Sequence, residues 1–509
     1  MELFSLQSLL FFPPSSLFFY FFTSPKQTLN GFKRYPLFGC LPGFIINDHR
    51  LLEWTTQKLK NYPTNTAVIY NPGRVHGVLT ANPSNVEYIL KTNFENYQKG
   101  DVFIAPLEDL LGRGIFNSDG ELWKVQRKTA SHQFNTKSLR NFVVENVKFE
   151  TCARLVPMLT KASEREEVLD LQGVLEKFAF DNICKVVFNV DPGCLGGDGA
   201  GVGAEFMRAF EDASNRSCGR FRYAFEFLWR LKKFYNIGSE RELKKSIAIV
   251  NEFSTDIIRS RLEAKKENEI GSNYNPCMNS PELYRDMAMN FILAGHDSTS
   301  SALSWFFWLL SSHPDVEENI LQKNQKIIGQ SYEFDELREM HYLHAALSES
   351  LRLYPPVPLD SKVCCNDDKL PDGTFVGKGW IISYHAYAMG RMEGIWGKNC
   401  HEFLPERWLE NGMFRQENAY RFPVFHAGPR MCIGKDMAYI QMKSIVASVI
   451  ERFIVDVQDK NKSPEHVLSM TLRMKNGLKV KVRKRSHVFY QLNYVRILHL
   501  LSIGLVGGL

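Results

Sequence analysis

The sequence has no Cys-x-x-Cys pair, and no histidine pair at zinc-ligand spacing accompanies its ten cysteines. The cysteines are scattered from Cys40 to Cys432 instead of being grouped. This scatter argues against a disulfide framework and against a structural zinc site. It fits a reducing compartment such as the cytosol, where thiols stay free.

The chain also has little net charge for its length, with +6 over 509 residues. Nucleic acid is therefore not the expected partner. A modestly basic surface suits an acidic redox protein or an anionic membrane instead. With 44% hydrophobic residues, 37 Phe and 8 Trp, the chain has ample material for a core. Its length allows two to four domains or a single large one.

Charge is absent from residues 3–22, which are almost wholly apolar. We interpret this run as a membrane anchor, since membrane helices tolerate its two prolines better than soluble helices would. A cleaved secretory signal is the alternative, but the run lacks a basic start and an obvious small-residue cleavage site. Lys26, Lys33 and Arg34 follow it, and the positive-inside rule then leaves the rest of the chain in the cytosol.

The next part of the chain predicts a mixture of strand and helix. The expected elements are strands at 66–70 and 77–80, a helix at 83–91, and mostly helix from 138 to 265. An aromatic cluster at 221–229 is more often core than cofactor site, and 266–281 has the composition of an exposed loop. Trp123 and Arg127 stand four apart in an amphipathic segment and so share a helical face, as an ordinary surface pair also would.

A long apolar helix is predicted from about Leu283 to Ser312, with Ala-Gly-His-Asp-Ser-Thr at 294–299 inside it. Glycine, hydroxyl and acid groups weaken a helix interior, so the motif contradicts its surroundings and signals function. We expect small residues to leave room above a flat cofactor, and Asp297 with Ser298 to hold water in a distorted turn that relays protons. A simple helix kink is the competing explanation.

The strongest signal is the stretch 425–434, Phe-His-Ala-Gly-Pro-Arg-Met-Cys-Ile-Gly, which precedes a helix-period pattern from Lys435. Its glycines let backbone amides approach the sulfur of Cys432, and Phe425 can shield that sulfur from water. Arg430 can reach a cofactor carboxylate, and the helix N-terminus favours an ionised thiol. A lone cysteine is usually just a small buried hydrophobe.

The combination Phe-x-x-Gly-x-Arg-x-Cys-x-Gly, ending at Gly434, resembles the haem-binding loop of the cytochrome P-450 superfamily of haem-thiolate monooxygenases. The resemblance implies a mainly α fold with a small β region. It implies haem b between the oxygen-site helix and the cysteine-loop helix, with Cys432 as the axial ligand of iron. It also implies Asp297, Ser298 and Thr299 as the oxygen-activation site.

Further residues take roles from the same resemblance. Trp123, Arg127 and Lys362 match haem propionate partners, alongside Arg430 and the ring of Phe425. Glu349 and Arg352 share a face of a helix predicted from about Asp335 to Leu353. They could be a weak surface pair there, but with Arg407 of Pro-Glu-Arg they resemble a buried structural network. The resemblance suggests substrate contacts at Ala294, Val357 and Leu472.

The helix motif at 294–299 departs from the family pattern at one position, where Ser298 replaces the usual threonine. The hydroxyl is kept but the rotamer restriction of a β-branched side chain is lost. Reduction could then couple less tightly to oxygenation. Asp297 together with a hydroxyl argues against the isomerase and dehydratase branches of the superfamily, which need no proton relay.

We expect four segments, the last of which departs from the family pattern, and the resemblance implies an ordinary microsomal arrangement. The segments are an anchor at 1–22, a basic proline-rich hinge at 23–45, a monooxygenase domain at 46–485 and an atypical apolar tail at 486–509. The expected partners are NADPH-cytochrome P-450 reductase, O2, a lipophilic substrate and the endoplasmic reticulum membrane, with the domain facing the cytosol.

Four stretches, 82–90, 181–192, 353–362 and 387–397, look like the plant group, of family 94 type, that hydroxylates fatty acids at or near the omega carbon. Relatives in that group oxidise jasmonoyl amino-acid conjugates, and others hydroxylate sterol side chains. All of these substrates require an elongated apolar channel that leads to the iron. A non-catalytic, membrane-tethered haem-binding sensor is the alternative from another class, which the intact motifs disfavour.

Overall fold

The computed structural model describes residues 32–35, 38–70, 76–131, 142, 146–197, 201–223, 225–268, 280–323, 333–460 and 462–485. The predicted anchor at 1–22, the tail at 486–509 and most of the predicted loop at 266–281 lie outside these residues. Among the described helices, none combines the length and apolar character needed to cross a membrane.

The protein is mainly helical with small sheets, as the sequence predicted. The longer helices are α3 (Leu51–Lys60), α5 (Asp101–Leu111), α6 (Gly120–Ser131), α9 (Val156–Glu164), α10 (Leu171–Phe188), α11 (Val202–Gly219), α12 (Glu226–Phe234), α13 (Ser239–Asn268), α14 (Pro281–Ser311), α15 (Pro314–Lys323), α17 (His341–Leu353) and α20 (Lys435–Arg452). Shorter ones include α2 (Leu41–Ile46), α4 (Pro83–Glu87), α16 (Phe334–Glu339), α18 (Ala386–Met389) and α19 (Glu393–Trp396).

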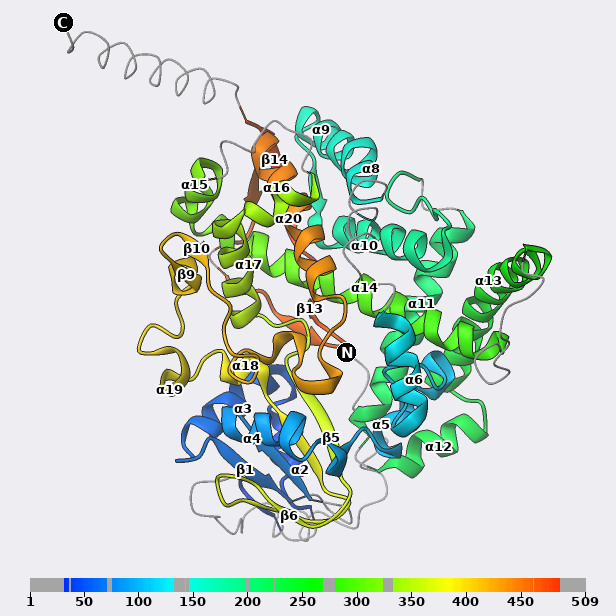
Figure 1. Ribbon diagram of the computed structural model, residues 1–509, viewed down its shortest axis with the longest axis vertical. Coiled ribbons are helices and arrows are strands. Elements are labelled where there is room, and N and C mark those ends of the chain that lie inside the picture. Colours follow the sequence, from blue (N-terminus) through cyan, green and yellow to red (C-terminus); the bar gives the residue numbers. More distant parts are fainter. Residues whose placement is uncertain are drawn as a thin grey trace, which may run out of the picture.

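The principal sheet gathers at one end of the molecule with α2, α3 and α4, and the long helices fill the rest (Figure 1). Its strand order is β1-β2-β8-β5-β3, with β2 and β8 parallel and the other pairs antiparallel. These strands are β1 (Thr66–Ile69), β2 (Gly77–Thr80), β3 (Tyr97–Gln98), β5 (Asp360–Cys364) and β8 (Ile381–Tyr384). The predicted strands at 66–70 and 77–80 are thus confirmed as its first hairpin.

Two further groups of strands lie in the C-terminal part of the chain. β11 (Phe453–Val457), β14 (Lys479–Lys484) and β4 (Val168–Asp170) form an antiparallel sheet in which β14 is central. β12 (His466–Leu468) and β13 (Leu472–Met474) form a hairpin. The carbonyl of Leu472 accepts hydrogen bonds from Ser301 Oγ at 2.6 Å and Trp305 Nε1 at 2.9 Å, which fasten this hairpin to α14.

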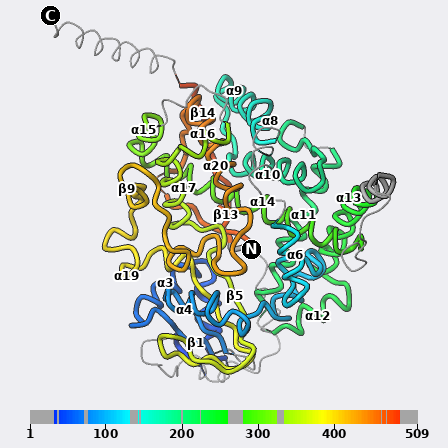
Figure 2. Tube along the Cα trace, in the orientation of Figure 1, coloured from blue at the N-terminus to red at the C-terminus, as the bar shows by residue number. Residues whose placement is uncertain are grey.

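The long helix α14 is the central element of the core. It starts where the sequence favours a start, with Ser280 accepting a hydrogen bond from the Leu283 amide and Pro281 in the first turn. It packs against α10 and lies beside α17 and α20, as the tube in Figure 2 shows. Gly295 permits the close approach to α10, because a Cβ there would come within 2.6 Å of the Ile183 side chain.

Two predictions about helices were wrong. The helix expected from 335 to 353 is divided at Met340 into α16 and α17, because Met340 leaves the helical region at ψ 70°. The distorted turn expected at 294–299 is absent, since α14 continues without a break. The Ser298 hydroxyl donates to the Ala294 carbonyl at 2.6 Å within an intact helix.

The fully buried Glu349 carboxylate is the centre of a polar network. Arg352 donates to it twice at 2.7 Å, Arg407 Nε at 3.3 Å and Trp408 Nε1 at 2.8 Å. The Arg352 guanidinium also binds the carbonyls of Cys400 and Glu402 at 2.7 and 2.9 Å. The weak surface pair is therefore excluded, and the network joins α17 to the segment that leads into the cysteine loop.

Candidate functional site

The cysteine loop is held in shape by its backbone. His426 and Gly428 both have positive φ, 56° and 65°, and a side chain at Gly428 would overlap the Leu90 carbonyl. The amide of Cys432 donates to the Phe425 carbonyl at 2.8 Å. Helix α20 then begins at Lys435, as the sequence predicted.

The electrostatic surroundings of Cys432 favour a thiolate only in part. Burial raises the pKa of the thiol, whereas a hydrogen bond from the Gly434 amide and the charges of Arg127 and Lys435 lower it. Net, the pKa stays above its ordinary value. A metal that binds the sulfur would supply the remaining stabilisation of the anion.

Cys432 lines a cavity of about 860 Å³. The cysteine loop contributes Phe425, His426, Arg430 and Gly434, and α14 contributes Ala294, Gly295, Ser298 and Thr299. The cavity extends to residues of α2 and of the 3-10 turn Arg220–Arg222 that follows α11. It thus runs from the predicted metal ligand toward the end of the molecule that holds the principal sheet.

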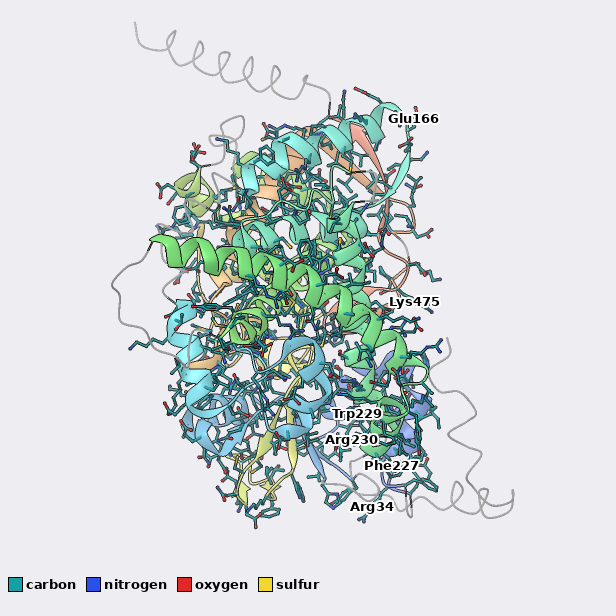
Figure 3. The ribbon with its side chains drawn as sticks, turned by 90° about the vertical axis from the view of Figure 1, so that its right-hand side faces the viewer. Arg34, Glu166, Phe227, Trp229, Arg230 and Lys475 are labelled. Carbon is teal, nitrogen blue, oxygen red and sulfur yellow. The ribbon has the colours of Figure 1, made fainter. Side chains whose placement is uncertain are left out.

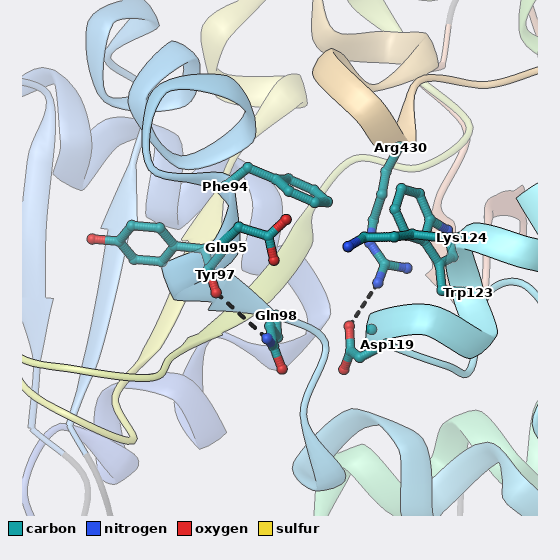
Figure 4. Close-up of a pocket in the computed structure, with 9 residues that line it drawn as sticks. Phe94, Glu95, Tyr97, Gln98, Asp119, Trp123, Lys124 and Arg430 are labelled. Carbon is teal, nitrogen blue, oxygen red and sulfur yellow. Dashed lines mark hydrogen bonds and ion pairs between the residues drawn. The ribbon is translucent and has the colours of Figure 1, made fainter.

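Arg430 lies at the edge of this cavity beside Trp123. Its guanidinium is 4.3 Å from the ring of Trp123 and donates to Asp119 Oδ1 at 2.6 Å and to the Ser118 carbonyl at 3.0 Å. Its Nε is buried without a hydrogen-bond partner among the described residues. Figure 4 shows the ion pair with Asp119 beside a pocket of about 10 Å³, which is enough for one water.

Two more predicted cofactor partners line the same cavity. Arg127, one turn after Trp123 on α6, is not hydrogen-bonded to any described residue, and burial lowers the pKa of its guanidinium. Lys362 on β5 is buried and donates to Asp360 Oδ2 at 2.6 Å. Burial lowers the pKa of Lys362 to about 7, against the raising effect of Asp360.

These residues fit a haem. A sulfur ligand, an aromatic ring and a surplus of cations surround one large cavity, and a buried Arg430 Nε there still lacks an acceptor. Iron would be held by Cys432, and two propionates would find Arg127, Arg430 and Lys362. The expectation that Gly295 leaves room for the cofactor needs correction, because Ile183 of α10 fills the space of its missing side chain.

The helix motif divides into two faces. Ala294, Ser298 and Thr299 line the cavity, whereas Asp297 does not. Oδ1 of Asp297 lies 2.8 Å from Nδ1 of the fully buried His296. A hydroxyl face thus meets the cavity and an acid–imidazole pair lies behind it.

The predicted substrate contacts divide similarly. Val357 lines the cavity together with Ala294. Leu472 does not, because its side chain is buried in the core while its carbonyl is bonded to α14. Met470 and Thr471, just before it, line the cavity in its place.

Sequence reasoning missed Asp119 and Asp360, the carboxylates paired with Arg430 and Lys362. Asp360 stands two residues before Lys362 on a strand, and this spacing puts both side chains on one face. That signal could have found it. Asp119 is distant in sequence from Arg430, so only the fold reveals their contact.

Comparisons with known proteins agree with this site. The family model described as Cytochrome P450 matches residues 29–482. Cytochrome P450 CYP94D108 of Paris polyphylla is 51% identical, with 88% of this chain and 91% of the relative aligned. Cytochrome P450 94A2 of Vicia sativa is 43% identical over 96% of this chain and 99% of its own. Cytochrome P450 94B3 of Arabidopsis thaliana is 42% identical over 91% and 94%.

Proposed function

Because the chain belongs to the cytochrome P450 family and is a cytochrome P450 monooxygenase, we propose that it hydroxylates an elongated apolar substrate with a carboxylate head. A fatty acid oxidised at or near the omega carbon fits this description best. The family implies a haem cofactor, O2 and a redox partner. We further propose haem b and NADPH-cytochrome P-450 reductase for these roles.

The observation that carries the substrate proposal is the polarity of the cavity from end to end. Its deep part is lined by Ala294, Val357 and other small or apolar side chains. Its other part is lined by Phe44, Ile45 and Phe221, and there Arg222 forms an ion pair with Asp48. Both charged side chains are 39% exposed, so they lie where the cavity meets solvent.

This arrangement favours one orientation of the substrate. An alkyl chain would be stabilised in the apolar interior at about 25 cal/mol per Å² of buried apolar surface. A carboxylate would stay at the rim, where it could bind Arg222 in competition with Asp48. The chain end then lies toward Cys432 and the head group in water.

The chemistry divides between cofactor and protein. A thiolate-ligated haem, when bound, activates O2 so that one oxygen atom is inserted into a C–H bond. The loop around Phe425 limits water at the sulfur, and Ser298 and Thr299 place hydroxyl groups at the cavity wall. Asp297, behind that wall and beside His296, can accept or return a proton that these hydroxyls pass on.

The haem assignment is tested by Cys432→Ala. We expect this variant to lose the reduced carbon-monoxide difference band of a haem-thiolate protein, because no other described cysteine lines the cavity near α20. A matched Cys152→Ala variant removes an exposed cysteine and should keep the band. A Cys432→Ala protein with an unaltered band would contradict the assignment.

The head-group assignment is tested by Arg222→Gln. With a fatty acid as substrate we expect KM to rise roughly tenfold, as the loss of one charge-assisted hydrogen bond predicts, with little change in kcat. The methyl ester of the same acid should show no such change. Equal changes in KM for the acid and the ester would refute the proposal that Arg222 binds the carboxylate head group.

A substrate panel separates the remaining candidates. Fatty acids of graded length and jasmonoyl-isoleucine both carry a carboxylate, whereas a sterol such as cholesterol does not. We propose that the acids are turned over with NADPH and reductase and that the sterol is not. Preferential oxidation of the sterol would overturn the proposal.

We also propose a location for the protein. The apolar run 1–22, the basic hinge 23–45 and the catalytic segment 46–485 support an endoplasmic reticulum membrane protein that faces the cytosol. The first segment and the tail at 486–509 lie outside the described residues. In Figure 3, Phe227, Trp229 and Arg230 of α12 are found toward the same end as Arg34, which follows the run.

A further inference from the structure

A largely buried carboxylate, Asp360, lies in the wall of the cavity at the end of β5. Its two oxygens accept from two lysines, Oδ1 from Lys99 Nζ at 2.8 Å and Oδ2 from Lys362 Nζ at 2.6 Å. Tyr384, directly across from Asp360 in the β5–β8 pair, donates its hydroxyl to Oδ2 at 3.1 Å. All four side chains line the cavity.

The same cluster reaches the cysteine loop. The Tyr384 hydroxyl lies 2.5 Å from Nδ1 of His426, and this nitrogen is 3.8 Å from Asp360 Oδ2. His426 precedes Cys432 by six residues and has φ 56°. The contact therefore connects the principal sheet to the loop that carries the predicted iron ligand.

The charges in this cluster do not cancel. Asp360 bears one negative charge, because Lys362 and Lys99 outweigh the effect of burial and hold its pKa well below the ordinary value. Burial lowers the pKa of His426 to about 4, so the imidazole is neutral at physiological pH. When both lysines are protonated, two positive charges against one carboxylate leave a surplus positive charge in the cavity wall, and such a charge favours an anionic ligand.

We infer that Asp360 is a positioning residue for the cofactor: it holds Lys99 and Lys362 together so that the pair can bind a carboxylate of the haem. This role rests on the proposed haem site. Asp119 is paired in the same way with Arg430, which lies near Arg127, although Asp119 itself does not line the cavity. The cavity wall thus holds two groups of cations, and each group is paired with one carboxylate. A haem has two propionates.

Asp360 and Lys99 have opposite effects on the pKa of Lys362, and this difference makes the inference testable. Asp360 raises the pKa of Lys362, whereas burial, Lys99 and Arg430 lower it. Removing the negative charge should leave Lys362 neutral at lower pH, and a neutral amine binds a carboxylate weakly. Removing the charge of Lys99 should keep Lys362 charged to higher pH.

The experiment measures haem loss from full-length holoprotein to an excess of haem-free myoglobin, between about pH 6 and about pH 9. We expect Asp360→Asn to lose haem on the order of tenfold faster than the parent, with the difference growing as the pH rises. Lys99→Met should also lose haem faster, but its pH dependence should move in the opposite direction. Asp360→Glu should restore most of the retention.

A matched control is Ser361→Ala, because Ser361 lies between Asp360 and Lys362 and its hydroxyl is hydrogen-bonded to Ser383 at 2.7 Å and not to Asp360 or either lysine. It should retain haem as the parent does. Tyr384→Phe should raise the share of protein whose reduced carbon-monoxide complex lacks the haem-thiolate band, since it removes the contact to the cysteine loop.

The outcomes separate this inference from the haem assignment itself. A parent protein without any haem-thiolate spectrum would defeat the proposed function. A normal parent spectrum, with Asp360→Asn and Lys99→Met both retaining haem at the parent rate and pH profile, would defeat only the inference. If Asp360→Asn does not fold, a Lys99→Met variant that loses haem with the pH profile of the parent would also defeat the inference.

Discussion

At the scale of single residues, the oxygen-site motif of α14 separates into two functions. Ser298 and Thr299 face the cavity, and Asp297 pairs with His296 behind it. The Ser298 hydroxyl donates its hydrogen to the Ala294 carbonyl. The side chain must therefore rotate away from the helix backbone before it can donate into the cavity. The serine, which lacks the β-branch of threonine, makes that rotation easier.

This separation predicts the effect of Asp297→Asn. We expect turnover to fall by about 10²-fold, because an amide cannot exchange a proton as a carboxylate does, while haem content stays unchanged. Stopped-flow reduction together with product and peroxide analysis measures this. The exposed Asp315→Asn on α15 serves as the control for loss of a carboxylate. If Asp297→Asn oxidises substrate at the rate of the parent protein, the proposed proton relay through Asp297 is wrong.

At the scale of elements, the loop that carries Cys432 is positioned by contacts from several directions. The Glu349 network joins α17 to the segment around Arg407. The backbone of Gly428 packs closely against the Leu90 carbonyl in the helical turn after α4. Tyr384 of β8 reaches His426. The predicted ligand therefore depends on elements that are far from it in sequence.

Glu349→Gln tests the network. The substitution leaves Arg352 buried without its counter-charge, and such a loss costs about 3–5 kcal/mol of unfolding free energy. Urea unfolding of the holoprotein measures the change, with the exposed Glu410→Gln on β9 (Leu409–Glu410) as the control. A difference below about 1 kcal/mol would mean that the network contributes little, as surface pairs do.

At the scale of the whole molecule, one buried histidine links stability to pH. His344 of α17 is stacked between Phe414 and Tyr439, each ring centroid 3.9 Å away, and its Nε2 is buried without a hydrogen-bond partner among the residues that the structure describes. Burial first, and then Lys443 and Lys435, lower the pKa of His344 to about 2. The unfolded chain takes up this proton below pH 6.5, whereas the folded protein does not, so stability falls as the pH falls.

His344→Phe should therefore reduce the acid sensitivity of the protein. Below pH 6.5 the parent should lose up to about 1.4 kcal/mol per pH unit through this residue, and the variant should not. Thermal unfolding at a series of pH values measures the slope, with exposed His49→Gln as the matched control. Identical slopes in parent and variant would show that His344 is protonated in the folded state.

The sequence by itself determined the family, the mainly helical fold class, the approximate bounds of α14, the start of α20, and most of the predicted site residues that line the cavity. Those features depend on local patterns: helix periodicity, caps and short motifs that constrain neighbouring residues. Only the tertiary structure decided that Asp297 faces away from the cavity, that Leu472 belongs to the core, and that Asp360 and Asp119 hold the cations. These depend on side-chain direction and on contacts between distant segments, which become fixed when the elements pack together.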